Sequence, residues 1–442
     1  MKMSDFIAKR GVWSNEILTR EAFFRFFRRP IVAVDALFLS QTEYWPLSNL
    51  RDLQWSRIQE VVTAARQIPF WKEWLSRSDL KKRLPSSWTD FELIPIVSKA
   101  DLKEQPVKNI FSGRDILHRS FADRTSGSTG EPFLFYVDRN YVLRSFSFCR
   151  RIFRWAGWRH GDIIVRLGGR DRRGFALDYH YLPTDTPADM ERSFNNLVRL
   201  GESYNIVLFS LASILLRFTQ VVKESKKTLN VKSVIYSGEA LLDHERALLS
   251  SVFKARLFNC YAGRETGWLA QECEMGGLHI NPEWAFLEIV DDKGKSLPIG
   301  RNGKLIATLF DNKVMPLIRY DTGDRGRFVV GKCQCRRTLP LIEFDGRSAD
   351  IIYFPEGHSM SFIESTYIFE RFANSIAAFR VIQESLKDLI IEIVLYSSDD
   401  FDAHDFLRHA ATYFRSEIHL EIRYRDRIDY AGEKRKVFLS YL

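Results

Sequence analysis

The string TSGSTGEP, from Thr125 to Pro132, combines the residue types that bind phosphate. Glycine lets backbone N–H groups converge on an anion, and serine and threonine add hydroxyl donors without bulk. The string lacks the Lys-Ser/Thr ending of a Walker loop. The alternative interpretation is a flexible surface turn, which is common for Gly/Ser clusters. The composition favours a loop that wraps a triphosphate, made of Thr125, Ser126, Gly127, Ser128, Thr129 and Gly130.

Four further strings follow this loop in order, namely YSGEAL, FNCYAGRETG, IRYDTGD and FDGRSAD. Together with the loop they resemble the acyl-adenylate-forming superfamily, specifically its phenylacetate–coenzyme A ligase-like branch, which includes capsule-biosynthesis relatives. The resemblance extends from about Ser86 to the C-terminus. It implies that the loop holds the phosphates of ATP.

The same resemblance assigns roles within the four strings. Gly238, Glu239 and Ala240 would lie against adenine and the acyl pocket, and Tyr261 would stack on adenine. Glu265 would help to hold Mg²⁺, a hard cation suited to carboxylate oxygen. Asp324 would accept hydrogen bonds from both ribose hydroxyls, and Arg347, at the hinge, would be the second ribose contact. A turn residue after glycine is the alternative for Asp324.

The chain departs from the family pattern beside Tyr261. The family has glycine and Thr/Ser where this chain has Ala262 and Arg264. A guanidinium can serve a phosphate in place of a hydroxyl, so Arg264 is a candidate for that contact.

Two more departures lie in the C-terminal part. The family lysine that neutralises the α-phosphate and carboxylate aligns with Glu433 in YAGEKRKVF, and Lys434 follows it. We expect Lys434 to take the catalytic role, because its long stem can adapt to a shift of one residue; a solvated EKRK terminus is the alternative. Ala349 stands where the hinge usually has Asp or Lys, which bears on domain rotation and therefore on the acceptor.

Four ligand-type residues form two short pairs, Cys273 with His279 and Cys333 with Cys335. Three thiolates and one imidazole complete a tetrahedral zinc site that leaves no position for water, so such a site would be structural. Some relatives in the resembled branch carry a similar set. The alternative is reduced, buried cysteines that pack as small apolar residues. Cys149 and Cys260 are left over, and we expect both in the core.

The elements that position these residues are predicted to form an α/β fold. Residues 52–80 have apolar residues at helical spacing, which predicts a helical entry region. From there to about residue 330, short apolar runs such as DIIVRL, NIVLFS, VKSVIYS and KLIATLF alternate with helix-like stretches such as DHERALLSSVF. This alternation predicts a large adenylate-forming domain of layered sheets and helices over residues 1–346.

The pattern changes after FDGRSAD. LIIEIVLYS reads as a strand, DAHDFLRHAATYFRSEI as an amphipathic helix and HLEIRYRDRI as another strand. We expect a small, mobile α+β lid domain over residues 347–442. With 442 residues, more than one packed unit is expected.

Composition limits the class of protein. With 45% hydrophobic residues and no low-complexity tract, the chain is an ordered globular protein. No apolar stretch reaches the ~20 residues of a membrane span, and no secretory signal is evident, so a cytoplasmic location without a membrane partner is expected. The net charge of +9 is spread along the chain, which disfavours nucleic acid as a partner.

The resemblance implies an ATP- and Mg²⁺-dependent ligase that converts a carboxylic acid into acyl-AMP and transfers the acyl group to coenzyme A. Aromatic residues around the expected pocket favour an aryl or arylacetic acid. Three alternatives stay open: an amine or carrier-protein thiol as acceptor, a catalytically impaired nucleotide-binding relative, and, least favoured, a nucleic-acid binder. A homodimer is also left open.

Overall fold

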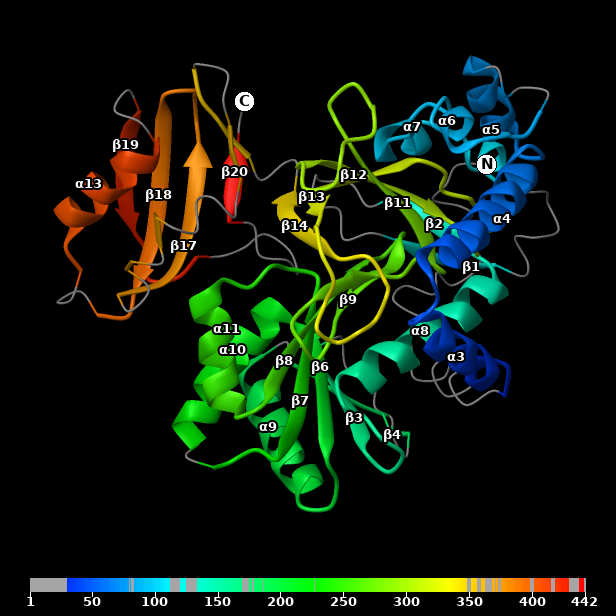
Figure 1. Cartoon of the computed structure of the whole chain (residues 1–442). Coiled ribbons are helices and arrows are strands. Elements are labelled where there is room, and N and C mark those ends of the chain that lie inside the picture. Colours follow the sequence, from blue (N-terminus) through cyan, green and yellow to red (C-terminus); the bar gives the residue numbers. More distant parts are fainter. Residues whose placement is uncertain are drawn as a thin grey trace.

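The protein is seen in a computed structural model that describes residues 30–78, 80, 83–111, 120–124, 133–168, 175–176, 179–184, 186–225, 227–347, 351–355, 359–361, 368–369, 371–372, 375–397, 401–414, 418–428 and 437–440. Helices between residues 30 and 103, an eight-stranded sheet, a four-stranded antiparallel sheet and a C-terminal α+β unit follow one another along the chain (Figure 1). The predicted α/β class is confirmed.

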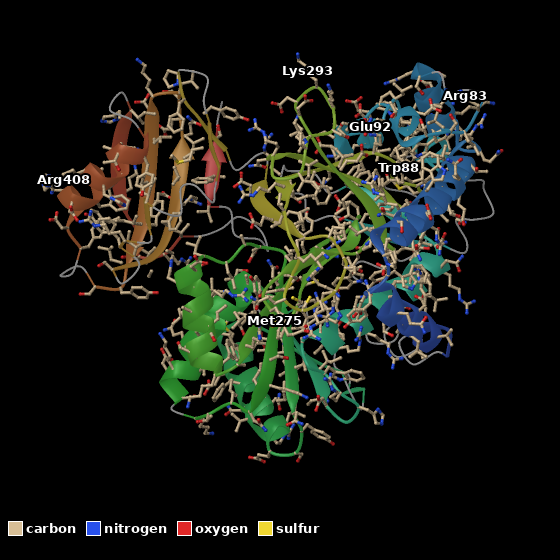
Figure 2. All side chains as sticks on the ribbon, viewed as in Figure 1. Arg83, Trp88, Glu92, Met275, Lys293 and Arg408 are labelled. Carbon is tan, nitrogen blue, oxygen red and sulfur yellow. The ribbon has the colours of Figure 1, made fainter. Side chains whose placement is uncertain are left out.

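The N-terminal helices form the predicted entry region. They are α3 (Pro30–Thr42), α4 (Leu47–Ala65), α5 (Pro69–Trp74), α6 (Trp88–Phe91) and α7 (Lys99–Lys103). Helix α4 buries one stripe that includes Leu50, Ile58 and Val62, as the apolar spacing predicts. Trp88 of α6 is labelled in Figure 2. Its ring packs on Phe286 of the four-stranded sheet with centroids 4.8 Å apart, which fixes this region on that sheet.

The eight-stranded sheet has the order β10-β9-β8-β7-β6-β3-β5-β4. Its strands are β3 (Ile163–Leu167), β4 (Phe175–Ala176), β5 (Tyr179–Leu182), β6 (Ile206–Leu211), β7 (Val231–Ser237), β8 (Arg256–Gly263), β9 (Gly267–Glu272) and β10 (Leu278–Ile280). The central five, β5 to β8 in spatial order, are parallel, and β9, β10 and β4 pair antiparallel at the margins. The apolar runs DIIVRL, NIVLFS and VKSVIYS thus form β3, β6 and β7, as predicted.

Helices cover both faces of this sheet. Helix α8 (Arg139–Trp155) lies on one face, and α9 (Pro187–Gly201), α10 (Ala212–Ser225) and α11 (Asp243–Phe253) lie on the other (Figure 1). Successive side chains of β6 point to opposite faces of the sheet. Val207 and Phe209 belong to the core on the α8 side, whereas Ile206 and Leu208 belong to the core on the side of α9 to α11. Burial on both faces explains why these strands are continuously apolar.

The four-stranded sheet is antiparallel throughout. It consists of β11 (Ala285–Val290), β12 (Gly303–Leu309), β13 (Tyr320–Phe328) and β14 (Ile342–Arg347). A separate two-stranded antiparallel sheet is formed by β1 (Phe121–Arg124) and β2 (Leu134–Val137).

The C-terminal unit contains β17 (Ile376–Gln383), β18 (Asp388–Leu395), α13 (Ala403–Phe414), β19 (His419–Tyr424) and β20 (Phe438–Ser440), preceded by the small hairpin of β15 (Ile351–Tyr353) and β16 (Ser359–Ser361). The two strands and the helix predicted here, β18, α13 and β19, are confirmed. This unit has a core of its own, which Leu242 of the β7–α11 loop also joins. Its predicted boundary at residue 347 and its mobility stay predictions.

A buried ionic network fastens α3 to α8 and to the segment after β10. Arg151 of α8 is 1% exposed and its Nη2 lies 2.7 Å from Glu283 Oε1. Its Nε lies 3.4 Å from Glu43, just after α3, and its Nη2 also donates to the Leu39 carbonyl at 2.6 Å. Burial raises the pKa of Glu283, but the Arg151 charge and hydrogen bonds outweigh it and hold that pKa below its usual value.

Within the described part of the chain, every helix is too short or too polar to cross a bilayer.

Replacing Arg151 tests how much this network contributes to stability. Arg151→Met leaves the buried Glu283 carboxylate without its guanidinium partner, so we expect a loss of about 3–5 kcal/mol of unfolding free energy. Thermal and urea unfolding measure it. Arg192→Met is the matched control, because Arg192 is 71% exposed and pairs with Asp189 on the surface, where about 0–1 kcal/mol is expected. Equal losses in the two variants would contradict the assigned role.

Candidate active site and metal centre

The phosphate-loop residues predicted from Thr125 to Gly130 lie outside the described residues, as do Glu433, Lys434 and Ala349. The strands on either side of these residues are described. Arg124 at the end of β1 pairs with Leu134 at the start of β2, so the intervening segment connects the two strands of an antiparallel hairpin.

The Gly238–Ala240 segment follows the carboxyl end of β7. Gly238 has φ +82°, a left-handed conformation that favours glycine. The carboxylate of Glu239 accepts the backbone N–H of Ser213 at 2.7 Å and its hydroxyl at 3.1 Å, at the start of α10. These bonds hold the turn against α10.

Tyr261 lies on β8 and reaches across to the four-stranded sheet. Its ring stacks on Phe344 of β14 with centroids 3.6 Å apart and planes 26° from parallel. Its hydroxyl donates a hydrogen bond to Asp324 Oδ2 on β13. The residues predicted to hold adenine and ribose are therefore in direct contact, although they belong to different sheets.

Asp324 is also fixed through the backbone. Its N–H donates to the hydroxyl of Thr322 at 3.2 Å, and that hydroxyl donates to the Leu305 carbonyl of β12 at 2.9 Å. In the ladder between β13 and β14, Asp324 is the register partner of Arg347. The two predicted ribose contacts thus lie on adjacent strands, directly opposite each other.

Glu265 lies in the turn between β8 and β9 and is half-buried. Its Oε1 accepts a hydrogen bond of 3.1 Å from the hydroxyl of Tyr320, the first residue of β13. Burial and the nearby Glu265 carboxylate raise the pKa of Tyr320, so its phenol remains a protonated donor. Burial first and then Glu265 likewise raise the pKa of Tyr141 on α8. A half-buried carboxylate oxygen of this kind fits a hard cation such as Mg²⁺.

Arg264, which departs from the family pattern, pairs with Asp123 Oδ1 at 3.3 Å. Asp123 lies on β1, immediately before the predicted phosphate loop. The guanidinium therefore links the β8–β9 turn to the strand that leads into the loop.

Sequence reasoning missed three aromatic residues in this region: Tyr320, Phe344 and Tyr141. Tyr320 lies inside the string IRYDTGD, and Phe344 is the first residue of FDGRSAD. Their position within these strings could have indicated that they belong to the site. Tyr141 carries no such signal, because helix α8 brings it to Glu265 only through tertiary packing.

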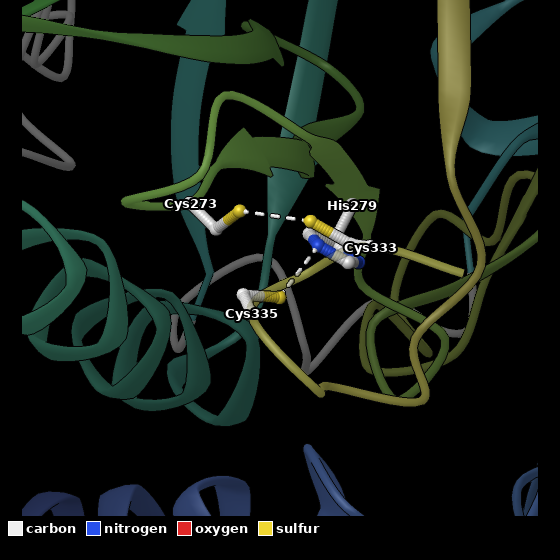
Figure 3. A group of neighbouring side chains, drawn as sticks. All are labelled: Cys273, His279, Cys333 and Cys335. Carbon is white, nitrogen blue, oxygen red and sulfur yellow. Dashed lines mark hydrogen bonds between the residues drawn. The ribbon is translucent and has the colours of Figure 1, made fainter.

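The four predicted zinc ligands come together after β9 and before β14 (Figure 3). Their ligand atoms all lie within 4.8 Å of one another. The sulfurs of Cys273 and Cys333 are 3.5 Å apart, and Cys335 Sγ is 3.3 Å from His279 Nε2. Tetrahedral zinc, with Zn–S about 2.3 Å and Zn–N about 2.0–2.1 Å, needs separations of about 3.8 and 3.6 Å. The donor set and its spacing therefore fit zinc.

Neighbouring groups shape this cluster. A Cβ on Gly277 would lie 2.8 Å from Cys333 Sγ, so the absence of a side chain there lets the two pairs approach. His279 Nδ1 lies 2.8 Å from the Leu339 carbonyl, which leaves Nε2 facing the thiols. Burial lowers the pKa of His279 and raises that of Cys273 to about 12. A neutral imidazole is the form that binds a metal.

Comparison with known proteins agrees with the fold and the motifs. No family model matches the chain. Phenylacetate-coenzyme A ligase of Thermus thermophilus is 24% identical over 332 residues, covering 72% of this chain and 74% of that protein. The enzyme of the same name from Pseudomonas putida is 22% identical over 333 residues, covering 72% and 75%.

A solved structure shares the fold of this chain. A 2-hydroxyisobutyryl-CoA ligase in the postadenylation state, in complex with R3-HIB-AMP, superposes with a TM-score of 0.75 and 17% identity over 91% of each chain. The motifs and the curated relatives both point to the acyl-adenylate-forming superfamily, and the chain is similar in sequence pattern to its phenylacetate–CoA ligase-like branch.

Proposed function

We propose that the protein activates a carboxylic acid with ATP, forming acyl-AMP and pyrophosphate, and then transfers the acyl group to coenzyme A. The observation that carries this proposal is a pair of hydrogen bonds between the two sheets: Tyr261 donates to Asp324, and Tyr320, four residues before Asp324, donates to Glu265. An aromatic ring, a ribose-type acceptor and a cation-binding carboxylate there match the three parts of a Mg²⁺-bound adenine nucleotide.

Adenylation would proceed by in-line attack of the substrate carboxylate on the α-phosphate, with pyrophosphate leaving. Tyr261 would stack on adenine, and Asp324 with Arg347 would hold the ribose. Amides and hydroxyls of residues 125–130 would take up charge on the phosphates. Mg²⁺, when bound through Glu265, would neutralise part of that charge. Lys434 would stabilise the α-phosphate and the carboxylate together.

The second half-reaction attacks the acyl carbonyl of acyl-AMP with the coenzyme A thiol and expels AMP. We propose that residues 347–442 rotate as a lid domain over residues 1–346 between the two steps. Neighbouring ligase structures in complex with 2-HIB-AMP and CoA support this acceptor. The curated relatives, named phenylacetate-coenzyme A ligases, support an arylacetic acid as substrate.

An amine as acceptor is the second candidate. An amide bond synthetase from Marinactinospora thermotolerans has a TM-score of 0.52 at 14% identity with this chain. Ala349 at the hinge motivates the same alternative, because altered rotation would affect thioester formation first. AMP release that depends on an amine and not on coenzyme A would favour it.

The cluster of Cys273, His279, Cys333 and Cys335 would hold a structural zinc ion, since all four tetrahedral positions are filled by protein atoms. Zinc there would tie the end of β9 to the segment that leads into β14 and thereby stiffen the edge that carries Tyr261 and Asp324.

Carboxylate-dependent ATP–pyrophosphate exchange tests adenylation directly. A panel of aromatic, arylacetic, aliphatic and amino acids should contain one that drives exchange. Asp324→Asn removes the charge that the ribose hydroxyls would bind, so we expect the KM for ATP to rise about 10- to 100-fold. Asp292→Asn, at a carboxylate 80% exposed on the β11–β12 loop, should leave KM unchanged. Failure of every acid would favour a non-catalytic nucleotide-binding relative.

The terminal lysine is tested in the same assay. Lys434→Ala should reduce exchange at least ~100-fold, because it removes a charge that acts on the reacting α-phosphate. Lys436→Ala, in the same basic run, is the control and should retain exchange. Loss in the control but not in Lys434→Ala would move the catalytic role to another residue.

Metal analysis of the purified protein tests the zinc site. About one zinc per chain is expected, and Cys335→Ser should lower both zinc content and melting temperature because one of four ligands is weakened. Cys149→Ala removes a buried cysteine of α8 that is not in the cluster, and should keep the metal. Full zinc content in Cys335→Ser would rule out this ligand set.

A further inference from the structure

Two hydrogen bonds cross the edge between the sheets in opposite directions. Tyr261 of β8 donates to Asp324 of β13, and Tyr320 of β13 donates to Glu265 beside β8. Each side of the contact thus supplies one tyrosine hydroxyl as donor and one carboxylate as acceptor. Tyr261 has a proposed role at adenine, and Tyr320 is the second phenol at this contact.

The backbone of Tyr320 is fixed by its neighbours. The Arg319 carbonyl accepts the N–H of Val97 at 3.0 Å, and the N–H of Asp321 donates to the Val97 carbonyl at 2.9 Å. Tyr320 also pairs with Ala307 of β12. Its side chain is 1% exposed. The hydroxyl therefore has a position set by β12 and by the segment before α7.

Arg319 adds a further constraint. It is a buried, non-glycine residue with φ +44°, a conformation that is held only where surrounding contacts compensate for it. Its guanidinium lies 3.0 Å from Glu288 and donates to the carbonyls of Ile94 at 2.8 Å and Gly294 at 3.2 Å. These contacts keep the chain turned so that Tyr320 faces the β8–β9 turn.

We propose that Tyr320 is a positioning residue, whose hydroxyl holds one oxygen of Glu265 so that the carboxylate meets Mg²⁺·ATP in a fixed orientation. The proposal rests on the proposed function for the identity of the ligand. A hydroxyl orients the carboxylate without cancelling its charge, which a lysine or arginine in the same place would do.

Binding of a non-hydrolysable ATP analogue to the full chain, measured with Mg²⁺ and with EDTA, tests this role. Tyr320→Phe keeps the ring and removes the hydroxyl. We expect the gain in analogue affinity produced by Mg²⁺ to fall about 10-fold, with affinity in EDTA unchanged, since partners of metal ligands typically affect metal binding by about 10- to 100-fold. In a Glu265→Gln background the same substitution should have no further effect.

Tyr236→Phe is the matched control. Tyr236 is a buried tyrosine whose hydroxyl accepts a bond of 2.8 Å from Arg246, away from Glu265. It should leave the Mg²⁺ gain unchanged even where stability falls. Arg319→Lys is a second variant, which keeps the Tyr320 hydroxyl but weakens the contacts that position it. We expect it to lose part of the gain in analogue affinity produced by Mg²⁺. This variant replaces Tyr320→Phe in the experiment if Tyr320→Phe does not fold.

The outcomes separate this inference from the proposed function. An unchanged Mg²⁺ gain in Tyr320→Phe, or equal losses with Mg²⁺ and with EDTA, would overturn it and leave only a structural role. If no acid drives exchange but wild type shows a Mg²⁺ gain that Tyr320→Phe reduces, the proposed reaction fails while the positioning role stands. A wild-type chain without any Mg²⁺ gain overturns the inference.

Discussion

The meeting of the eight-stranded and four-stranded sheets is the constraint on which the candidate site depends. Neither sheet alone carries all of its groups, because Tyr261 and Glu265 belong to the β8–β9 hairpin and Asp324 belongs to β13. Two tyrosine-to-carboxylate hydrogen bonds and the stack of Tyr261 on Phe344 join them. Hydrogen bonds to charged acceptors are stronger than those to neutral ones, so the two carboxylates stabilise the contact between the sheets.

The Cys/His cluster and the buried ionic network lie next to each other and are joined by Arg337. Arg337 follows Cys335 by two residues, and its guanidinium lies 3.2 Å from Glu43 and 2.7 Å from Glu274. It also lies over the Trp155 ring, 4.1 Å from the centroid, while Trp155 packs edge-on against His279. Residues far apart in sequence are therefore held in one unit that braces β9 and β10 against α3 and α8.

Much of the fold follows from local pattern. The apolar runs that form β3, β6 and β7 and the amphipathic stretches that form α11 and α13 could be recognised because burial imposes a period of two or about 3.6 residues. The entry region was also recognisable as helical, although Pro69 starts a new helix, α5, after the end of α4. Sheet order could not be read in this way, since it depends on long-range pairing.

The sequence by itself determined the residue types of the site: a Gly/Ser/Thr-rich string for phosphate, carboxylates in fixed strings, and a Cys/His set with metal-ligand chemistry. This chemistry depends on residue types and on short spacings in the sequence. Only the tertiary structure decided which groups hold one another, because Tyr320 and Glu265 are 55 residues apart and Arg264 and Asp123 are 141 apart. Contacts over such separations arise from sheet packing, which no short window of sequence contains.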